Sequence, residues 1–269
     1  MVPAAAAVEL LHEFSLVHDD IEDGDRERRG RPTLWAVWGL AQAINAGDAL
    51  FALAFRALNG LAERDVPPGL ILEAQRRFVR TVMRLCEGQH LDLAFEQRVD
   101  ITPDDYVLMV GGKTAALVAL AAELGGLVAG AEEKLVSALA RFGRAVGLAF
   151  QMQDDLLGLW GNPERTGKPA GNDLRRRKKS LPILLARHMS DEVAALLDML
   201  YTAEHVSDGM VLQALRLIER SGARQEVEAR TRDAYREAVQ VLDELEAELT
   251  PRRLVPLRQL TEELMGREY

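Results

Sequence analysis

Apolar residues recur at spacings of three and four along most of the chain, which is the period of an amphipathic or buried α-helix. The first such run contains Val8, Leu11 and Phe14 and leads into an acidic segment at residues 18–23. No window alternates between apolar and polar positions as a half-buried strand does. We therefore expect an all-α protein, built as a bundle of antiparallel helices.

Proline, glycine and hydroxyl residues divide the helical runs. Helices are expected at residues 35–61, 70–97, 106–130 and 132–160, and further helices from residue 181 onward are divided near Ser207, Ser221 and Thr250. Thr102-Pro103 marks a helix start, and the apolar 106–130 run predicts a helix buried on most sides. Because the chain shows neither a fixed repeat nor a linker composition, we expect one domain over residues 1–269.

Composition narrows the class of protein. The chain has 33 Lys and Arg against 42 Asp and Glu, and its formal charge of −9 argues against a general nucleic-acid binder. Its one cysteine, Cys86, excludes a disulfide framework and favours a reducing compartment. The start lacks the basic region of a signal peptide, and no apolar run approaches the ~18 residues that span a bilayer. We expect a cytoplasmic protein without a membrane span.

The strongest chemical signal is the segment His18-Asp19-Asp20-Ile21-Glu22-Asp23, which is followed by Arg28-Arg29-Gly30-Arg31-Pro32-Thr33. Asp19 and Asp23 stand one helical turn apart, so a helix points both carboxylates the same way. Hard oxygen ligands gathered like this suit Mg²⁺ bound together with substrate phosphates. The arginines add planar cations that match phosphate oxygens. The segment therefore predicts a metal-bridged diphosphate site.

A second acidic pair strengthens this interpretation. Gln151-Met152-Gln153-Asp154-Asp155 lies in an apolar helical run, and Gly167-Lys168-Pro169, Asp173 and Lys178-Lys179 follow it. A single acidic pair is common on protein surfaces, but two distant pairs, each followed by cations, indicate a shared function. Alone, the basic block 175–179 would be a solvated helix end; beside Asp173 and Lys168 we expect it to face phosphate.

Two other motifs fail on their spacing. A calcium loop beginning at Asp19 would have Ile21 at its third position and Gly30 at its twelfth, and neither offers a side-chain oxygen. Gly112-Lys113-Thr114 looks like the end of a Walker phosphate loop, but the loop's first glycine would fall on Val107, and no strand precedes it. Lys113 and Thr114 stay candidates for phosphate binding in another geometry.

Together, these motifs resemble the trans-isoprenyl diphosphate synthases, the head-to-tail prenyltransferases of the geranylgeranyl and farnesyl type. The resemblance runs from about Pro3 to the C-terminal helices. It is carried by the aspartates 19, 20 and 23 with the arginine pair, by Lys113-Thr114, by Phe150 to Asp155, and by Gly167-Lys168-Pro169 with Asp173 and Lys178. The implied fold is a helical bundle around a central cavity.

The resemblance also implies roles for individual side chains. Direct Mg²⁺ ligands would be Asp19, Asp23 and Asp154, with Asp20 and Asp155 holding metal-bound waters. The cations that bind the allylic diphosphate would be Arg28, Lys113, Lys168 and Lys178. Thr114 and Gln151 would place oxygens near an allylic carbocation, His12 and Arg29 would hold isopentenyl diphosphate, and His18 would be a packing residue.

The implied reaction is the Mg²⁺-dependent condensation of isopentenyl diphosphate with an allylic diphosphate, usually in a homodimer. Helical geometry places Ser15 and Phe14 about one turn before Asp19, facing the growing chain. This pair resembles enzymes that stop near geranylgeranyl diphosphate. Farnesyl or longer products stay alternatives, because Ala46, Leu50 or Leu53 could instead set the depth of the pocket.

Two departures from the family pattern matter. Gly158 stands where most relatives have a third aspartate in the second motif, so a water-mediated metal contact would be lost. The family's Gly-Gly-Lys-x-x-Arg segment, expected upstream of the first aspartates, does not occur before Asp19. Either the start is truncated or two helices are missing, which leaves a catalytically silent regulatory subunit as one alternative. A terpene cyclase is another, although the retained Arg28-Arg29 and Lys113-Thr114 speak against it.

Overall fold

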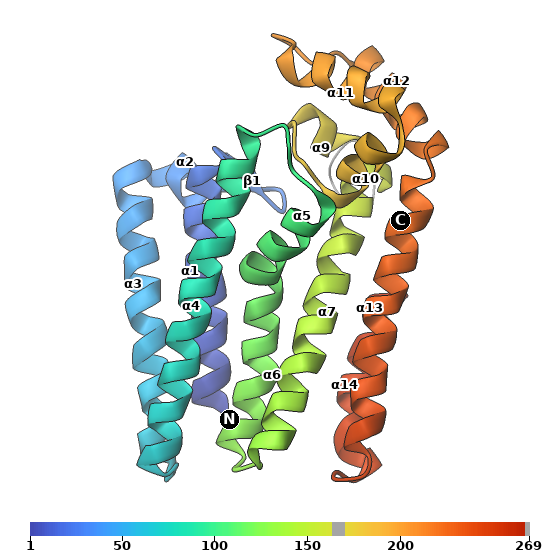
Figure 1. The fold of residues 1–269 in the computed structure, drawn as a ribbon. Helices are drawn as coiled ribbons and strands as arrows, with labels where there is room; N and C mark the ends of the chain where they lie inside the picture. The colour runs from blue at the N-terminus through green and yellow to red at the C-terminus, as the bar shows by residue number, and fades with distance from the viewer. Residues whose placement is uncertain (163–169, 267–269) are drawn as a thin grey trace. The chain divides into compact units, whose positions relative to one another are not determined.

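The computed structural model describes residues 1–162 and 170–266, and it confirms the all-α expectation (Figure 1). The N-terminal helices are α1 (Val2–Glu22), α2 (Leu34–Trp38), α3 (Leu40–Asn59) and α4 (Pro68–Glu96), with a 3₁₀ turn at Gly60–Arg64. The middle helices are α5 (Pro103–Val110), α6 (Ala116–Val128) and α7 (Glu133–Trp160). The remaining helices are α9 (Asn172–Arg175), α10 (Leu181–Met189), α11 (Asp191–Thr202), α12 (Asp208–Arg220), α13 (Ala223–Leu245) and α14 (Pro251–Met265).

The residues group into two compact units. Unit 1 comprises Met1–Met83 and Ala119–Ala140, and unit 2 comprises Arg84–Val118 and Arg141–Tyr269. The helices α4, α6 and α7 each contribute residues to both units. The expectation of one domain over the whole chain stays a prediction.

In unit 1, α1 packs closely along α3. Small buried residues make this possible, since Ala4 and Ala7 of α1 and Ala43 of α3 leave little side chain between the helices. Aromatic rings continue the interface: the Phe14 and Phe51 ring centroids lie 4.9 Å apart. Such tilted ring pairs add to the free energy gained from burying their apolar area.

Unit 1 also contains a buried cation, Arg77 of α4, whose side chain is 6% exposed. Its guanidinium donates hydrogen bonds to Glu73 at 2.8 Å, to Glu123 at 2.8 Å and to Glu133 at 2.6 Å. A guanidinium that has lost its water needs such partners, because an unpaired buried charge is costly. The three carboxylates therefore fix α4 against the residues of α6 and α7 that belong to this unit.

Unit 2 has an apolar core that supports the later helices. Leu156 and Leu159 of α7 pack in one cluster with Leu181 and Ile183 of α10 and with Val227 of α13. Helix α5 begins as the sequence predicts: the Thr102 hydroxyl accepts a hydrogen bond from the Asp105 backbone N–H, and the Asp105 carboxylate accepts one from the Thr102 backbone N–H. This core positions the second acidic pair.

One described stretch, Pro103–Val128, is long and apolar enough to cross a membrane by length and composition alone, with a mean hydropathy of 1.7 in its most apolar window. No apolar run of this length was expected from the sequence. Of this window, 44% is buried inside the protein, and core helices of soluble proteins meet the same criterion. The stretch is therefore weak evidence for a membrane span.

Replacing Arg77 tests the ionic cluster. We expect Arg77→Ala to lower the free energy of unfolding by about 3 kcal/mol or more, because it leaves carboxylates facing one another without their cation. Urea denaturation measures this loss. The matched control is Arg80→Ala: Arg80 is 57% exposed and lies 3.5 Å from the same Glu123, so its loss should stay below about 1 kcal/mol. Equal losses of unfolding free energy in the two variants would contradict a structural role for the buried Arg77.

Candidate functional site

A short hairpin, which the sequence analysis did not expect, follows α1. The strands β1 (Glu27–Arg28) and β2 (Arg31–Pro32) pair antiparallel, with Arg28 opposite Arg31. Both turn residues have positive φ, 52° at Arg29 and 72° at Gly30, as a two-residue type I′ turn requires. A ladder of two pairs is too short to show an alternating pattern, which is why it was missed. The hairpin turns the chain back and leaves Arg29 exposed at its tip.

The hairpin aims Arg28 at the first acidic motif. Arg28 Nε donates to Asp20 Oδ1 at 2.7 Å, and Nη2 donates to Asp19 Oδ2 at 3.1 Å. Burial raises the pKa of Asp20 despite the neighbouring Arg28. Asp23 ends α1 in helical conformation, and its backbone N–H donates to the Asp19 carbonyl at 2.8 Å. Asp19 and Asp23 therefore lie one helical turn apart, as expected from the sequence. The positive charge of Arg28 partly compensates the negative charges of Asp19 and Asp20.

Packing of α1 against α3 determines where His18 lies. A Cβ built on Gly47 would lie 2.2 Å from His18 Nε2. The imidazole therefore occupies space that any side chain at position 47 would fill. The Phe14 ring lies 4.7 Å from His18, centroid to centroid. His18 thus packs between the helices, one residue before Asp19.

Lys113 and Thr114 lie on an irregular turn inside the predicted 106–130 helix. Residues Gly111–Ala115 form a π-helical segment between α5 and α6, a feature frequent at functional sites. Its backbone fits against α4 because a Cβ on Gly88 would lie 2.2 Å from the Lys113 nitrogen. On the other side, a Cβ on Gly147 of α7 would lie 2.7 Å from the Ala115 Cα. Glycines in α4 and α7 thus determine where Lys113 and Thr114 lie.

The contacts of these two residues identify a further polar residue, Asp92, that was not a candidate from the sequence. Lys113 Nζ lies 2.5 Å from Asp92 Oδ2, and Thr114 Oγ1 donates to Gln151 Oε1 at 3.0 Å. Asp92 lies on the polar face of α4, where an acidic residue carries no signal of its own. Only its contact with Lys113 identifies it.

The second acidic pair lies near the C-terminal end of α7, with Asp154 exposed and Asp155 buried. Asp155 accepts hydrogen bonds from the Leu181 backbone N–H at 2.8 Å and from Gln151 Nε2 at 3.2 Å. Burial, and then the negative charge of Asp173, raises the pKa of Asp155 to about 7. The structure therefore brings Gln151, Thr114 and Asp155 into one hydrogen-bonded chain.

The structure gives the hydrogen-bond partners of three cations in the basic block, which was expected to face phosphate. Arg175 donates to Asp208 and to the Ala170 carbonyl, and Arg177 donates to the Ala203 carbonyl. Lys179 donates to the carbonyl oxygens of Phe95 and Glu96, the last residues of α4. These three cations are bound to protein groups, and the expectation that the block faces phosphate stays a prediction. Lys178 is exposed, whereas Gly167, Lys168 and Pro169 lie outside the described residues.

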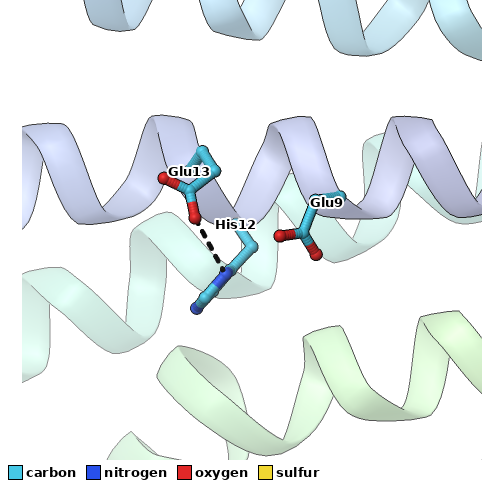
Figure 2. Close-up of side chains that lie close together, drawn as sticks. All are labelled: Glu9, His12 and Glu13. Carbon is cyan, nitrogen blue, oxygen red and sulfur yellow. Dashed lines mark ion pairs between the residues drawn. The ribbon is translucent and has the colours of Figure 1, made fainter.

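His12, proposed for the second substrate, and the chain-length residues Phe14 and Ser15 lie on α1, whereas Arg29 lies at the tip of the hairpin. Figure 2 shows His12 between Glu9 and Glu13, with His12 Nδ1 3.9 Å from Glu13 Oε1. One ligand atom from each of the three lies within 4.8 Å of the others, but both glutamates are exposed, as is common without a metal. The Ser15 hydroxyl donates to the His12 carbonyl at 2.7 Å, so it is engaged with its own helix.

Comparison with known proteins decides the family. A model of the polyprenyl synthetase family matches residues 1–218. The chain belongs to this family. The resemblance seen in the motifs is therefore confirmed.

Two curated relatives of this polyprenyl synthetase are named for two different products. A geranylgeranyl diphosphate synthase of Mycobacterium tuberculosis is 50% identical over 201 residues, which cover 75% of this chain and 56% of the relative. A (2E,6E)-farnesyl diphosphate synthase of Mycobacterium bovis is 51% identical over 184 residues, 68% of this chain and 49% of the relative. The chain thus spans about half the length of the curated relatives it matches.

A solved structure supports the fold of this polyprenyl synthetase. Geranylgeranyl pyrophosphate synthase from Corynebacterium glutamicum, complexed with isoprenyl diphosphate and magnesium, is 28% identical and superposes with a TM-score of 0.88. The match covers 99% of this chain and 79% of that chain. The chain therefore has the all-α isoprenoid synthase fold.

The buried Asp155 makes stability depend on pH. Since its pKa is raised from 3.8 to about 7, the folded chain keeps a proton that the unfolded chain releases between these values. The free energy of unfolding should therefore fall as pH rises from about 4 to about 7, by on the order of 3 kcal/mol. Asp155→Asn cannot ionise, so we expect it to gain stability over the parent chain as pH rises.

Urea denaturation in EDTA at about pH 5 and about pH 8 measures this difference. The control is Asp154→Asn, which changes the neighbouring exposed carboxylate and keeps Asp155, so its stability should fall with pH as that of the parent chain does. A difference between Asp155→Asn and the parent chain that is the same at both pH values would mean that Asp155 is already ionised at low pH.

Proposed function

We propose that this polyprenyl synthetase condenses isopentenyl diphosphate with an allylic diphosphate in a Mg²⁺-dependent reaction, with geranylgeranyl diphosphate as the product. The observation that carries the proposal is the first motif, where Arg28 is hydrogen-bonded to both Asp19 and Asp20. The geranylgeranyl diphosphate synthase relative, 50% identical, supports the same reaction.

The donor atoms fit magnesium. Asp19, Asp23 and Asp154 offer hard carboxylate oxygens, which Mg²⁺ prefers, and Asp20 and Asp155 would accept hydrogen bonds from metal-bound water. The bound magnesium of the Corynebacterium relative agrees with this choice. When bound, Mg²⁺ supplies Lewis-acid stabilisation of the diphosphate leaving group. Asp19 already lies beside a cation, Arg28, that would reach the same diphosphate.

The cations of the chain would neutralise the allylic diphosphate. Arg28, Lys113, Lys168 and Lys178 take this role, because charge develops on the diphosphate as the carbon–oxygen bond breaks. Lys113 is held ready by Asp92, 2.5 Å away, which keeps the ammonium paired before the substrate arrives. Exchange of this partner for phosphate costs little, since a charged hydrogen bond is replaced by another.

The allylic carbocation would be stabilised by neutral oxygens. Gln151 Nε2 donates to Asp155, and Gln151 Oε1 accepts from Thr114 Oγ1, so both amide ends are oriented. The Thr114 and Gln151 oxygens could then face the cation without a negative charge that would capture it. The released diphosphate would take the proton in the last step, and no further base is needed. His12 and Arg29 would bind isopentenyl diphosphate.

Product length would be set on α1. Phe14 is held by its neighbours, with the Phe51 ring 4.9 Å away, and Ser15 adds little volume beside it. A fixed aromatic ring about one turn before Asp19 would stop the growing tail. Geranylgeranyl diphosphate is the proposed product, and the farnesyl diphosphate synthase relative keeps farnesyl diphosphate as the alternative.

A homodimer is part of the proposal. Val37, Trp38, Leu40 and Ile44, on α2 and the start of α3, are exposed apolar residues close together in the chain. Exposed apolar patches of this kind commonly mark interfaces between proteins. A second copy of the chain would cover them.

Turnover tests the reaction. The purified chain is incubated with Mg²⁺, isopentenyl diphosphate and geranyl or farnesyl diphosphate, and the products are sized. We expect a 20-carbon product, and Asp19→Ala should lower turnover by about 100-fold or more while helical content is unchanged. Asp233→Ala, an exposed change on α13, is the control.

Two outcomes would contradict the assignment. Full activity of Asp19→Ala would contradict the role given to the first motif. Turnover that appears only when another prenyltransferase is added would contradict independent catalysis and favour the silent-subunit alternative.

A further inference from the structure

A half-buried tyrosine of α11 holds the backbone of one of the lysines proposed to bind the allylic diphosphate. The Tyr201 hydroxyl donates a hydrogen bond to the Lys178 carbonyl oxygen at 3.1 Å. Burial raises the pKa of Tyr201, so the hydroxyl keeps its proton to donate at neutral pH. The Lys178 carbonyl therefore has a fixed partner on a helix that carries neither acidic motif.

The amide side of Lys178 is held by the short helix α9. The Lys178 N–H donates to the Asp173 carbonyl at 2.8 Å, and the next N–H toward α9, that of Arg177, donates to the Leu174 carbonyl at 3.1 Å. This pair of bonds is the pattern of a Schellman helix end, whose intervening residue is left-handed, and the φ of Arg177 is 56°. Because both backbone polar groups of Lys178 are bound, the direction in which its side chain leaves the backbone is fixed.

The two neighbours of Lys178 reinforce this arrangement. A left-handed conformation is unfavourable for a residue with a Cβ, so Arg177 needs other contacts to keep it. Its guanidinium donates to the carbonyl of Ala203, the residue that ends α11. On the other side, Lys179 donates to the last carbonyls of α4, and its ammonium lies 5.7 Å from the Tyr201 ring centroid. Contacts of all three consecutive cations thus reach α11.

The same segment leads to the second acidic motif. The Leu181 backbone N–H, three residues after Lys178, donates to the Asp155 carboxylate at 2.8 Å. Lys178 is exposed, and its ammonium stands on a flexible four-carbon stem. Ordering such a side chain on a phosphate costs conformational entropy, and a fixed backbone lowers that cost. The hydrogen bond to the Lys178 carbonyl therefore prepares this lysine for an anion beside the second motif.

We propose that the Tyr201 hydroxyl positions Lys178 for the diphosphate of the allylic substrate by fixing the Lys178 carbonyl. The inference rests on the proposed function and adds to it a positioning residue from α11. Tyr201 acts through Lys178 and has no contact of its own with the substrate. Loss of its hydroxyl should therefore weaken diphosphate binding only while the Lys178 ammonium is present, which distinguishes positioning from a general effect on the fold.

A double-mutant cycle tests this dependence. Binding of inorganic pyrophosphate in the presence of Mg²⁺ is measured by calorimetry for the full parent chain, Tyr201→Phe, Lys178→Ala and the double variant. Tyr201→Phe keeps the ring and removes the hydroxyl, so we expect about 5-fold weaker binding, as for the loss of one neutral hydrogen bond. In the Lys178→Ala background the same change should have no further effect, because the ammonium that it positions is gone.

The matched control removes the next hydroxyl along α11. The Thr202 hydroxyl donates to the Asp198 carbonyl at 2.8 Å, within its own helix. We expect Thr202→Val to bind pyrophosphate as the parent chain does. Circular dichroism checks that the helical content of every variant is unchanged.

The outcomes separate the inference from the proposed function. If Tyr201→Phe binds pyrophosphate as well as the parent chain, the inference is wrong and the proposed function stands. If Tyr201→Phe causes the same fold loss in both backgrounds, the hydroxyl acts independently of Lys178 and the inference is again wrong. Unchanged binding by Lys178→Ala would remove the role given to this lysine, and the inference with it. If the parent chain does not bind pyrophosphate with Mg²⁺, the proposed function itself fails.

Discussion

Negative charge held close together has to be compensated, and this constraint shapes each of the two acidic motifs. Arg28 contacts Asp19 and Asp20, whereas the buried Asp155 is met by the Leu181 N–H and the Gln151 amide. Under the proposed function, a diphosphate and its metal ions would partly replace these partners when substrate binds.

Backbone geometry positions charged side chains within each unit. The positive φ at Gly30 closes the hairpin that turns Arg28 toward α1, and Gly88 lets the π-helical segment approach α4 so that Lys113 meets Asp92. Gly158 does the same for an acidic group, because it leaves room for Asp173. At Gly88 and Gly158, the absence of a side chain leaves space for a neighbouring group. A substitution at such a position would act on the site through displacement of a charged side chain.

Long periodic segments could be predicted from the sequence because their helices depend on local pattern. The 70–97 and 132–160 predictions match α4 and α7 within two residues, and the Thr102 cap was correctly located. The one-turn spacing of Asp19 and Asp23 also followed from helix geometry. What could not be predicted depends on tertiary contacts: the two-pair hairpin, the partner of Lys113, and the position of Asp173. The partners of Arg177 and Lys179 could not be predicted for the same reason, since the carbonyl groups that accept their hydrogen bonds come from segments distant in the sequence.

The central claim of the proposed function is that the first acidic motif binds Mg²⁺ together with diphosphate. Calorimetry tests it directly: Mg²⁺ binding in the presence of inorganic pyrophosphate is measured for the parent chain, for Asp19→Ala and for Asp233→Ala, which changes an exposed carboxylate on α13. The account predicts about 10-fold or weaker Mg²⁺ binding by Asp19→Ala, because a hard oxygen ligand is lost, and unchanged binding by Asp233→Ala. Equal binding by Asp19→Ala and the parent chain would contradict the account.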